Sequence, residues 1–188
     1  WSERIAVPDA GRPHPAPLVL SKTLASIDPP APRFTPKLKK DPVQAGSISV
    51  AQYEVIALAK DAHARIVPEA DGEAAYRMGF MLADGTGAGK TISTMGIIAD
   101  NWADGRRRHV YITEKARHLA QAEKAATMVG LRKSDIFTLD KYPTHAMIPK
   151  RDGILFLTYA DLRHATSANK KAGVYPRLKQ VLDWCGAE

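Results

Sequence analysis

The sequence predicts an α/β fold in which a parallel β-sheet lies between layers of helices. Short apolar runs of strand length alternate along the chain with segments whose apolar residues recur at helical spacing. The glycine-rich run DGTGAGKT, residues 84–91, stands between one such apolar run and one such helical segment. Most of the 13 prolines fall within residues 1–47. We therefore expect an extended proline-rich arm over residues 1–47 and the α/β domain over residues 48–188.

Length and composition are those of a globular protein. The chain has 188 residues, of which 45% are hydrophobic and 25% charged, enough for one domain with a sizeable core. No apolar run approaches the roughly 20 residues that a transmembrane helix needs. Cys185 is the only cysteine, so an internal disulfide is excluded and a buried or half-buried structural thiol is expected. We expect a cytoplasmic protein without membrane contact, and the start at Trp1 rather than Met indicates either an internal piece of a longer chain or a renumbered chain.

The arm is defined by its prolines, because each proline fixes φ and removes a backbone donor. Their density favours an extended, polyproline-like backbone over helices or central strands. Leu18, Val19 and Phe34 are apolar anchors that would hold the arm along the surface of the domain. A disordered linker is the alternative that the composition leaves open. The prolines concerned are Pro8, Pro13, Pro15, Pro17, Pro29, Pro30, Pro32, Pro36 and Pro42.

The first elements of the domain lead from a helix to a strand. Ser49 is a candidate N-cap, and the apolar residues after it continue at helical spacing, which predicts a helix over about residues 50–65. A polar linker follows over residues 68–75. Residues 78–83, MGFMLA, form a short and nearly continuous apolar run of the kind that a buried parallel strand shows.

The glycine-rich run predicts a phosphate-binding loop. Its glycines let the backbone bend so that N–H groups point at an anion, Lys90 adds a mobile positive charge, and Thr91 offers a hydroxyl to Mg²⁺. Asp84 occupies the position where the strict pattern has glycine. Apolar residues recur at helical spacing over 92–102, and Gly105 ends that pattern. A glycine-rich surface turn is the alternative, but it would not explain why Gly-Lys-Thr opens an amphipathic helix.

The remaining elements continue the alternation of strands and helices. After a basic turn at residues 106–108, strands are expected over 109–113, 135–139 and 153–159. Helices are expected over 114–130, 161–168 and 177–185. Because parallel strands need crossover connections, the helices between them would cover both faces of the sheet.

Four stretches of the chain are distinctive beyond this pattern. They are RPHPAPLVLSKTLASIDPPAPRFTPKL in the arm, SISVAQYEVIALAKDAH at the first helix, GFMLADGTGAGK with IIADNWADGRRRHVYIT around the loop, and GILFLTYADLR further on. Their order resembles the first recombinase-like domain of a superfamily-2 helicase, and in detail they resemble the strawberry-notch family of P-loop ATPases. The resemblance extends from about His14 to Trp184. It implies a three-layer recombinase-like P-loop sheet and an ATP hydrolase that acts on nucleic acid.

The family resemblance implies ATP and Mg²⁺ as cofactors. Gln52 stands where such helicases place the glutamine that reads adenine, which a side-chain amide can do by donating and accepting hydrogen bonds; a solvated helix glutamine is the alternative. Asp84 matches the acidic residue that opens the loop in related DNA translocases. Lys90 and Thr91 take the catalytic roles, with Thr91 on the metal, although many family members have glycine at that position. The expected nucleotide site comprises Gln52, Asp84, Gly85, Thr86, Gly87, Ala88, Gly89, Lys90 and Thr91.

The resemblance also implies contacts to nucleic acid. Such helicases hold phosphates at the carboxyl ends of strands through N–H groups, hydroxyls and basic side chains. The candidates are Thr113, Lys115, Thr158 and Tyr159, although each alone could equally be an ordinary strand-end residue. The net charge of +7 suits a polyanionic partner, and DNA in a bacterial cell or a mobile element is the expected one. The arginines at 106–108 are expected to form a solvated turn, because they precede a strand.

No apolar strand ending in Asp-Glu occurs in the sequence. In the family, the chain would continue past Glu188 into this acidic motif II and a second recombinase-like domain, which are the expected missing partners. We therefore expect an incomplete domain that binds nucleotide weakly and hydrolyses nothing appreciable, because hydrolysis needs those carboxylates. The alternative is a non-catalytic nucleotide-binding scaffold or regulatory module for proteins that process nucleic acid. The arginine lid of a kinase and the Asn-Lys-x-Asp guanine reader of a GTPase are not found in the sequence.

Overall fold

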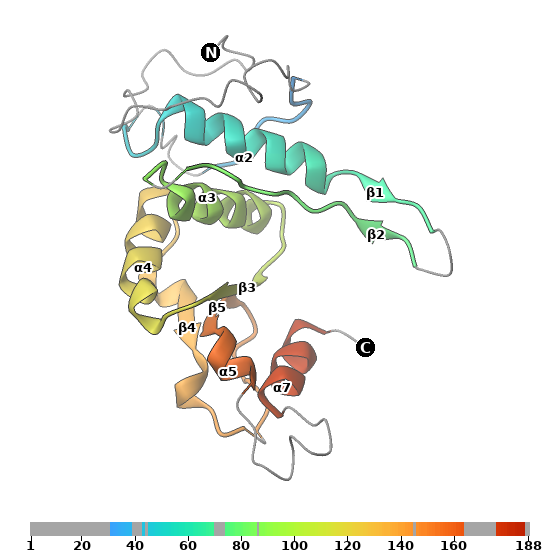
Figure 1. Cartoon of the computed structure of the whole chain (residues 1–188), viewed down its shortest axis with the longest axis vertical. Coiled ribbons are helices and arrows are strands. Elements are labelled where there is room, and N and C mark those ends of the chain that lie inside the picture. Colours follow the sequence, from blue (N-terminus) through green and yellow to red (C-terminus); the bar gives the residue numbers. More distant parts are fainter. Residues whose placement is uncertain are drawn as a thin grey trace. The chain divides into compact units, whose positions relative to one another are not determined.

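The computed structural model is drawn in Figure 1. Its chain forms two compact units. The first contains residues 1–104 and 125–131, and the second contains residues 105–124 and 132–188. The structure describes residues 31–38, 43, 45–69, 74–85, 87–144, 146–163 and 176–186. Each unit is considered by itself below. Most of the expected arm, including the anchors Leu18 and Val19, lies outside the described residues.

Two long helices form the centre of the first unit. Helix α2 spans Val50–His63 and helix α3 spans Lys90–Ala103, in agreement with the helical spacing of the sequence. They pack closely at Gly96, where an added Cβ would lie 2.2 Å from Cδ1 of the buried Ile56. The end of helix α4 (Leu119–Met128) and the residues after it complete this core with Val129. A glycine at position 96 is therefore required by the close approach of the two helices.

A short antiparallel hairpin follows α2 in the first unit. Its strands are β1 (Ile66–Val67) and β2 (Tyr76–Arg77), and Ile66 faces Arg77 across the pair. The prediction of a strand over 78–83 is wrong, because these residues belong to neither sheet of the described structure. Met78 extends the hairpin by one hydrogen bond, from its N–H to the Arg65 carbonyl at 3.0 Å. An apolar run forms a strand only where a neighbouring backbone pairs with it, and Met81 is 86% exposed.

Part of the arm is held against α2 by charge. The Arg33 Nε donates to Asp61 Oδ1 at 2.8 Å, and Arg65 Nη2 donates to Asp61 Oδ2 at 2.5 Å. These bonds, that from Arg33 foremost, hold the pKa of Asp61 below its ordinary value, against the opposing effect of burial. Phe34, expected as an apolar anchor, is 41% exposed instead. Ion pairs therefore help to hold this segment, in which Pro36 is also buried.

A second set of ion pairs joins the arm to α3. The Lys37 N–H donates to Asp100 Oδ1 at 2.7 Å, while its Nζ lies 2.7 Å from Asp104 Oδ1. Lys60 of α2 reaches both carboxylates, at 2.7 Å for Asp100 and 3.2 Å for Asp104. Asp100 is buried, so its charge is compensated by two partners from different segments. The described segment 31–38 thus lies along both helices.

The second unit is built on a three-stranded parallel sheet in the order β3-β5-β4. The strands are β3 (Arg108–Thr113), β4 (Ile136–Thr138) and β5 (Gly153–Thr158). Every residue of the central strand β5 is buried. Parallel strands flanked by helices agree with the predicted α/β class.

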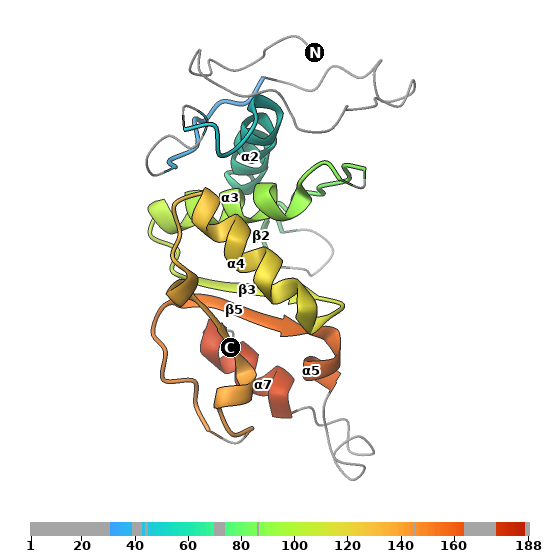
Figure 2. The ribbon, with the colours of Figure 1, turned by 90° about the vertical axis from the view of Figure 1, so that its left-hand side faces the viewer.

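Helices lie against this sheet (Figure 2). Its two faces carry different side chains. Helix α7 (Pro176–Cys185) packs on one face, where Val181 and Trp184 join Phe137 and Leu155 in a buried core. On the other face the rings of Tyr111 and Phe156 stack at 5.6 Å. None of the helices in the described part of the chain is long and apolar enough to cross a membrane.

Two predicted helices start at different residues from those expected. The helix predicted from 114 begins with a 3-10 turn at Ala116–His118 and continues as α4, which ends before Gly130 as expected. Helix α5 spans Tyr159–Arg163, so Tyr159 is a helical residue and not the end of a strand. The cause is local, because Thr158 and Asp161 form reciprocal hydrogen bonds that start the helix there. The rest of the helix predicted over 161–168 lies outside the described residues.

Candidate functional site

The glycine-rich loop of the first unit opens directly into α3. Gly87 and Gly89 have φ angles of +85° and +82°, a left-handed conformation that other residues adopt at a cost. Gly89 is the N-cap, and its carbonyl accepts hydrogen bonds from the N–H groups of Ile92 at 2.8 Å and Ser93 at 3.2 Å. The backbone therefore turns into the helix at the point where an anion can meet the positive end of the helix dipole.

Lys90 folds back over this loop. Its Nζ donates to the carbonyls of Asp84 at 2.8 Å and Gly85 at 2.9 Å, and both hydrogen bonds are exposed. It is thus the backbone of Asp84, and not its carboxylate, that contacts the lysine. Exposed hydrogen bonds of this kind cost little to exchange, so the ammonium group is held near the loop in a position from which it can turn to a phosphate.

Gln52 of α2 lies against the same loop. It is buried, with its Nε2 donating to the Ala88 carbonyl at 3.5 Å. Its Oε1 accepts from the Ser49 N–H at 2.9 Å, and Ser49 Oγ accepts from the Gln52 N–H at 3.3 Å, a complete capping box. The family resemblance predicts Gln52 at the nucleotide site, and the structure brings its side chain to the loop. The capping role was readable from the Ser-x-x-Gln spacing.

Two threonines complete the sequence of the loop and the start of the helix after it. Thr91 is half-buried in the first turn of α3, and Thr86 lies outside the described residues. Within the described part of the chain, no group of three or more His, Cys, Asp or Glu side chains could hold a metal ion.

The second unit gathers threonines at the carboxyl ends of its strands. Thr113 and Thr158 are partners in the register of β3 and β5, so two of the predicted nucleic-acid residues are neighbours. Thr113 Oγ1 lies 2.7 Å from His118 Nδ1. Lys115 and Tyr159 follow these strands in the chain; Tyr159 is 61% exposed, and Lys115 pairs with the adjacent Glu114 at 3.2 Å.

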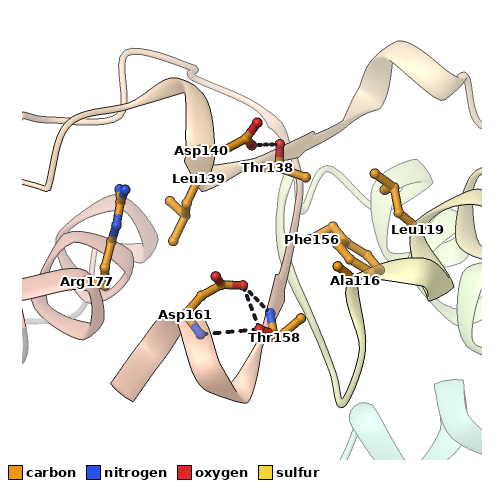
Figure 3. Close-up of a pocket in the computed structure, with 9 residues that line it drawn as sticks. All are labelled: Ala116, Leu119, Thr138, Leu139, Asp140, Phe156, Thr158, Asp161 and Arg177. Atoms are coloured by element: carbon orange, nitrogen blue, oxygen red, sulfur yellow. Dashed lines mark hydrogen bonds between the residues drawn. The ribbon is translucent and has the colours of Figure 1, made fainter. Parts of the chain in front are cut away.

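A pocket of about 450 Å³ lies at this edge of the sheet (Figure 3). Its buried floor comes from Phe156, Leu139 and Thr158. Sequence reasoning missed its charged residues, although the Thr-x-x-Asp spacing of Thr158 and Asp161 is a readable capping signal. The full lining is Ala116, Leu119, Thr138, Leu139, Asp140, Phe156, Thr158, Asp161 and Arg177.

The basic turn and the cysteine lie away from these strand ends. Arg106, Arg107 and Arg108 are exposed, as expected, but Arg108 also donates to the carbonyls of Arg151 at 3.1 Å and Trp184 at 2.9 Å. Cys185 is exposed, and the expectation of a buried or half-buried thiol is wrong because the residue ends α7. Partial desolvation of its sulfur nevertheless raises the pKa of the Cys185 thiol, so it is a poor nucleophile at neutral pH.

The chain matches the family model of the P-loop containing NTP hydrolase pore-1 domain over residues 13–188. The chain belongs to this P-loop family. It is 31% identical over 182 residues to Protein FORGETTER 1 of Arabidopsis thaliana, and 30% identical to the strawberry notch homolog 1 of Gallus gallus and to strawberry notch of Drosophila melanogaster. Each match covers 95% of this chain. The chain is thus a P-loop domain of the strawberry-notch family.

The chain spans only 13%, 14% and 11% of the length of these three relatives. All three are eukaryotic, so they do not support the expected bacterial or mobile-element origin, which stays a prediction. No solved structure is significantly similar to the chain.

Proposed function

We propose that this P-loop chain is the ATP-binding part of a helicase-like or translocase ATPase that acts on nucleic acid, with DNA as the expected polymer. The observation that carries the proposal is the left-handed glycine loop at the start of the 14-residue helix α3, with Lys90 folded over it and Gln52 packed beneath it. A nucleoside triphosphate could use all of these groups, with its phosphates at the loop and Lys90 and its base at Gln52.

The residues present fit ATP and Mg²⁺. The loop N–H groups and the start of α3 would receive the phosphates, and Lys90 would turn from the Asp84 and Gly85 carbonyls to their oxygens. Thr91 would offer its hydroxyl to Mg²⁺, which neutralises the charge of the phosphates when bound. Gln52 keeps a second amide N–H and a second oxygen lone pair beyond its two internal contacts, so it could still meet adenine.

The proposed nucleic-acid contacts are at the strand ends of the second unit. Ligands of parallel α/β sheets bind outside the carboxyl ends of the strands, and Thr113 and Thr158 end adjacent parallel strands. Tyr159, at 61% exposure, offers an aromatic face on which a base can stack. Lys115 adds a positive charge beside them. The expected carboxyl-terminal motif II and second recombinase-like domain would complete the motor.

The first experiment measures binding of a fluorescent ATP analogue to the 188-residue chain with Mg²⁺. We expect Lys90→Ala to weaken binding about tenfold or more, because hydrogen bonds to charged groups contribute about 1.5–3 kcal/mol. Lys133→Ala, an exposed lysine on a separate 3-10 turn, serves as the matched control and should bind like the parent chain. Equal binding by parent and Lys90→Ala would refute the phosphate site.

The same protein tests the expected lack of hydrolysis. We expect no ATP turnover above the rate in buffer, because the chain holds no Asp-Glu strand end to position water. Mg²⁺-dependent turnover that Lys90→Ala abolishes would overturn this expectation. The alternative is a non-catalytic nucleotide-binding scaffold or regulatory module that partners proteins which process nucleic acid. That alternative predicts nucleotide binding without turnover even when the downstream segments of the native protein are present.

A further inference from the structure

A larger groove of the second unit lies at the amino ends of the strands. It has a volume of about 680 Å³ and is lined by one side of helix α7, by the segment 146–151 and by Arg108. Arg108 is the first residue of β3 and pairs with Gly153, the first residue of β5. Ligands of parallel sheets bind at the carboxyl ends of the strands, so the proposed function does not use this groove.

The two walls of the groove are tied together by side-chain hydrogen bonds. From α7, Gln180 Nε2 donates to the Ala146 carbonyl at 2.6 Å, and Trp184 Nε1 donates to the Lys150 carbonyl at 2.6 Å. Both donor side chains are buried. Residues 147–150 form neither helix nor strand, so these bonds hold an irregular segment in place. A partner would therefore meet a surface that is already positioned, which lowers the entropic cost of binding.

The groove offers apolar surface to a partner. Met147 lines it and is 89% exposed, and Ile148, next to it in the same wall, is buried. Pro149 and Pro176 add rings and have no backbone N–H to leave unsatisfied. One exposed apolar side chain alone would need no explanation. Here the flexible thioether stands in a formed groove, where it can adapt to an aliphatic side chain.

The charge of the groove is predominantly positive. Its charged lining residues are Arg108, Lys150, Arg151, Lys179 and Asp183. Lys179 and Asp183 pair with each other at 2.8 Å. The Nζ of Lys150 donates to the Ser134 carbonyl at 2.9 Å and lies over the Phe137 ring, so it is used within the fold. The two arginines remain as the charges that a partner would meet.

The two arginines are adjacent in the structure. Arg108 Nε donates to the Arg151 carbonyl at 3.1 Å, and Arg108 Nη1 donates to the Trp184 carbonyl at 2.9 Å. These acceptors are neutral, so they leave the charge of the guanidinium uncompensated. Neither arginine has an ion-pair partner among the residues that the structure describes. A carboxylate from outside would supply the missing negative charge, and guanidinium groups bind carboxylates well.

Charge and shape together favour a peptide over a nucleic acid. A single strand would also be attracted to the arginines, but proteins bind single strands with exposed rings on which the bases stack. Trp184, the aromatic side chain in the lining, is only 6% exposed. An acidic peptide with an aliphatic side chain uses both the arginines and the apolar wall.

We propose that this groove docks an acidic peptide segment of a partner protein, with an aliphatic side chain of the peptide against Met147 and its carboxylates on Arg108 and Arg151. None of these residues belongs to the nucleotide site or to the proposed nucleic-acid contacts. The groove can therefore be tested separately from the proposed function.

The test measures fluorescence anisotropy of two fluorescein-labelled peptides, DELDELDE and DESDESDE, on the 188-residue chain at about 0.15 M salt, where distant charges are screened. We expect the leucine peptide to bind about fivefold tighter, because it buries apolar surface. Met147→Ser should bring the ratio of the two dissociation constants close to one. Arg151→Glu should weaken binding of both peptides about fivefold, since it replaces an attraction by a repulsion.

Arg163→Glu is the matched control for Arg151→Glu. It makes the same change of charge, but it lies on α5 beyond the carboxyl end of β5 and outside the groove. Its affinity for both peptides should stay within about twofold of the parent value. Met147, Arg151 and Arg163 are all exposed, so the fold should survive each substitution, and circular dichroism checks this.

Four outcomes would overturn the proposal. The first is that the leucine peptide does not bind at concentrations up to about 1 mM. The second is an equal loss in Arg151→Glu and Arg163→Glu, which would mean unspecific attraction to the net charge of +7. The third is that Arg151→Glu weakens binding of labelled oligo-dT more than Arg163→Glu does, which would assign the groove to nucleic acid. The fourth is a dimer in sedimentation that Met147→Ser dissociates, which would assign it to a second copy of the chain.

Discussion

A side chain at position 89 would meet two obstacles at once. The backbone there has a φ of +82°, and an added Cβ would lie 2.2 Å from Nε2 of Gln52. Gly85 of the same loop meets neither obstacle, since nothing lies within 4 Å of a Cβ built on it and its φ is not left-handed. The two glycines look alike in the sequence, and only the backbone angles and the position of α2 distinguish them.

We predict that Gly89→Ala lowers the free energy of unfolding by roughly 1–2 kcal/mol, the cost of a left-handed L-residue, with the contact to Gln52 adding to it. Gly85→Ala should change it by less than about 0.5 kcal/mol. Urea denaturation of both variants measures the difference. Equal stabilities would mean that the left-handed turn at the start of α3 is not formed in solution.

Asp61 gives a second prediction at the scale of a residue. Its pKa lies below the ordinary 3.8 because of the hydrogen bond from Arg33. A depressed carboxyl pKa adds stability that is fully present above the unfolded pKa and is lost as the pH falls through the folded pKa. The melting temperature should therefore fall as the pH is lowered below about 4, the ordinary range of an Asp carboxyl, and it should fall less in Asp61→Asn. Parallel pH profiles of the two proteins would contradict this account.

At the scale of elements, the close packing of α2 on α3 depends on Gly96 and Ile56. Adding a methyl group at position 96 places it against Cδ1 of Ile56, which overpacks a core that is already filled. The sequence showed the helical spacing around Gly96 but not which residue of another helix would lie over it.

We predict that Gly96→Ala destabilises the protein by about 1–3 kcal/mol. Ile56→Val alone should cost about 0.5–1.5 kcal/mol, because it removes one buried methyl group. The double variant should lose less free energy of unfolding than the two single variants lose together, since the methyl group removed from Ile56 is the one that clashes. Additive costs in a urea-denaturation cycle would show that the two side chains do not meet.

The elements also show what the sequence could predict. Helix α2, the loop, α3, β3, β5 and α7 follow from local patterns of caps, glycines and apolar spacing. The prediction of a strand over 78–83 failed because a strand forms only beside a second strand that shares its backbone hydrogen bonds. An apolar run in the sequence does not show whether such a neighbour exists. The β1–β2 hairpin was missed for the same reason, since two residues per strand give no periodicity. Likewise, Arg177 and Asp140 come together in a pocket only through tertiary structure.

At the scale of the whole molecule, the net charge of +7 favours binding to a polyanion such as single-stranded DNA. A chain that contacts about three phosphates should release a corresponding number of counterions, which gives a slope of roughly −2 in a plot of log affinity against log salt. We predict that binding to single-stranded DNA weakens about tenfold or more between 50 and 200 mM salt. Fluorescence anisotropy at several salt concentrations measures the slope. Affinity that does not change with salt would exclude phosphate contacts as the source of binding.

The ionic contacts of segment 31–38 determine where a protease can cut this chain and still leave a stable folded fragment. The composition predicts that the arm ends near residue 47. Arg33 and Lys37 of the arm nevertheless contact the carboxylates of Asp61, Asp100 and Asp104 in and beside the two helices that follow. A cut at that boundary would leave three carboxylates with only Lys60 and Arg65 as partners. Limited proteolysis that trims the chain before residue 31 keeps these charges matched. The stable fragment should therefore begin inside the proline-rich region rather than after it.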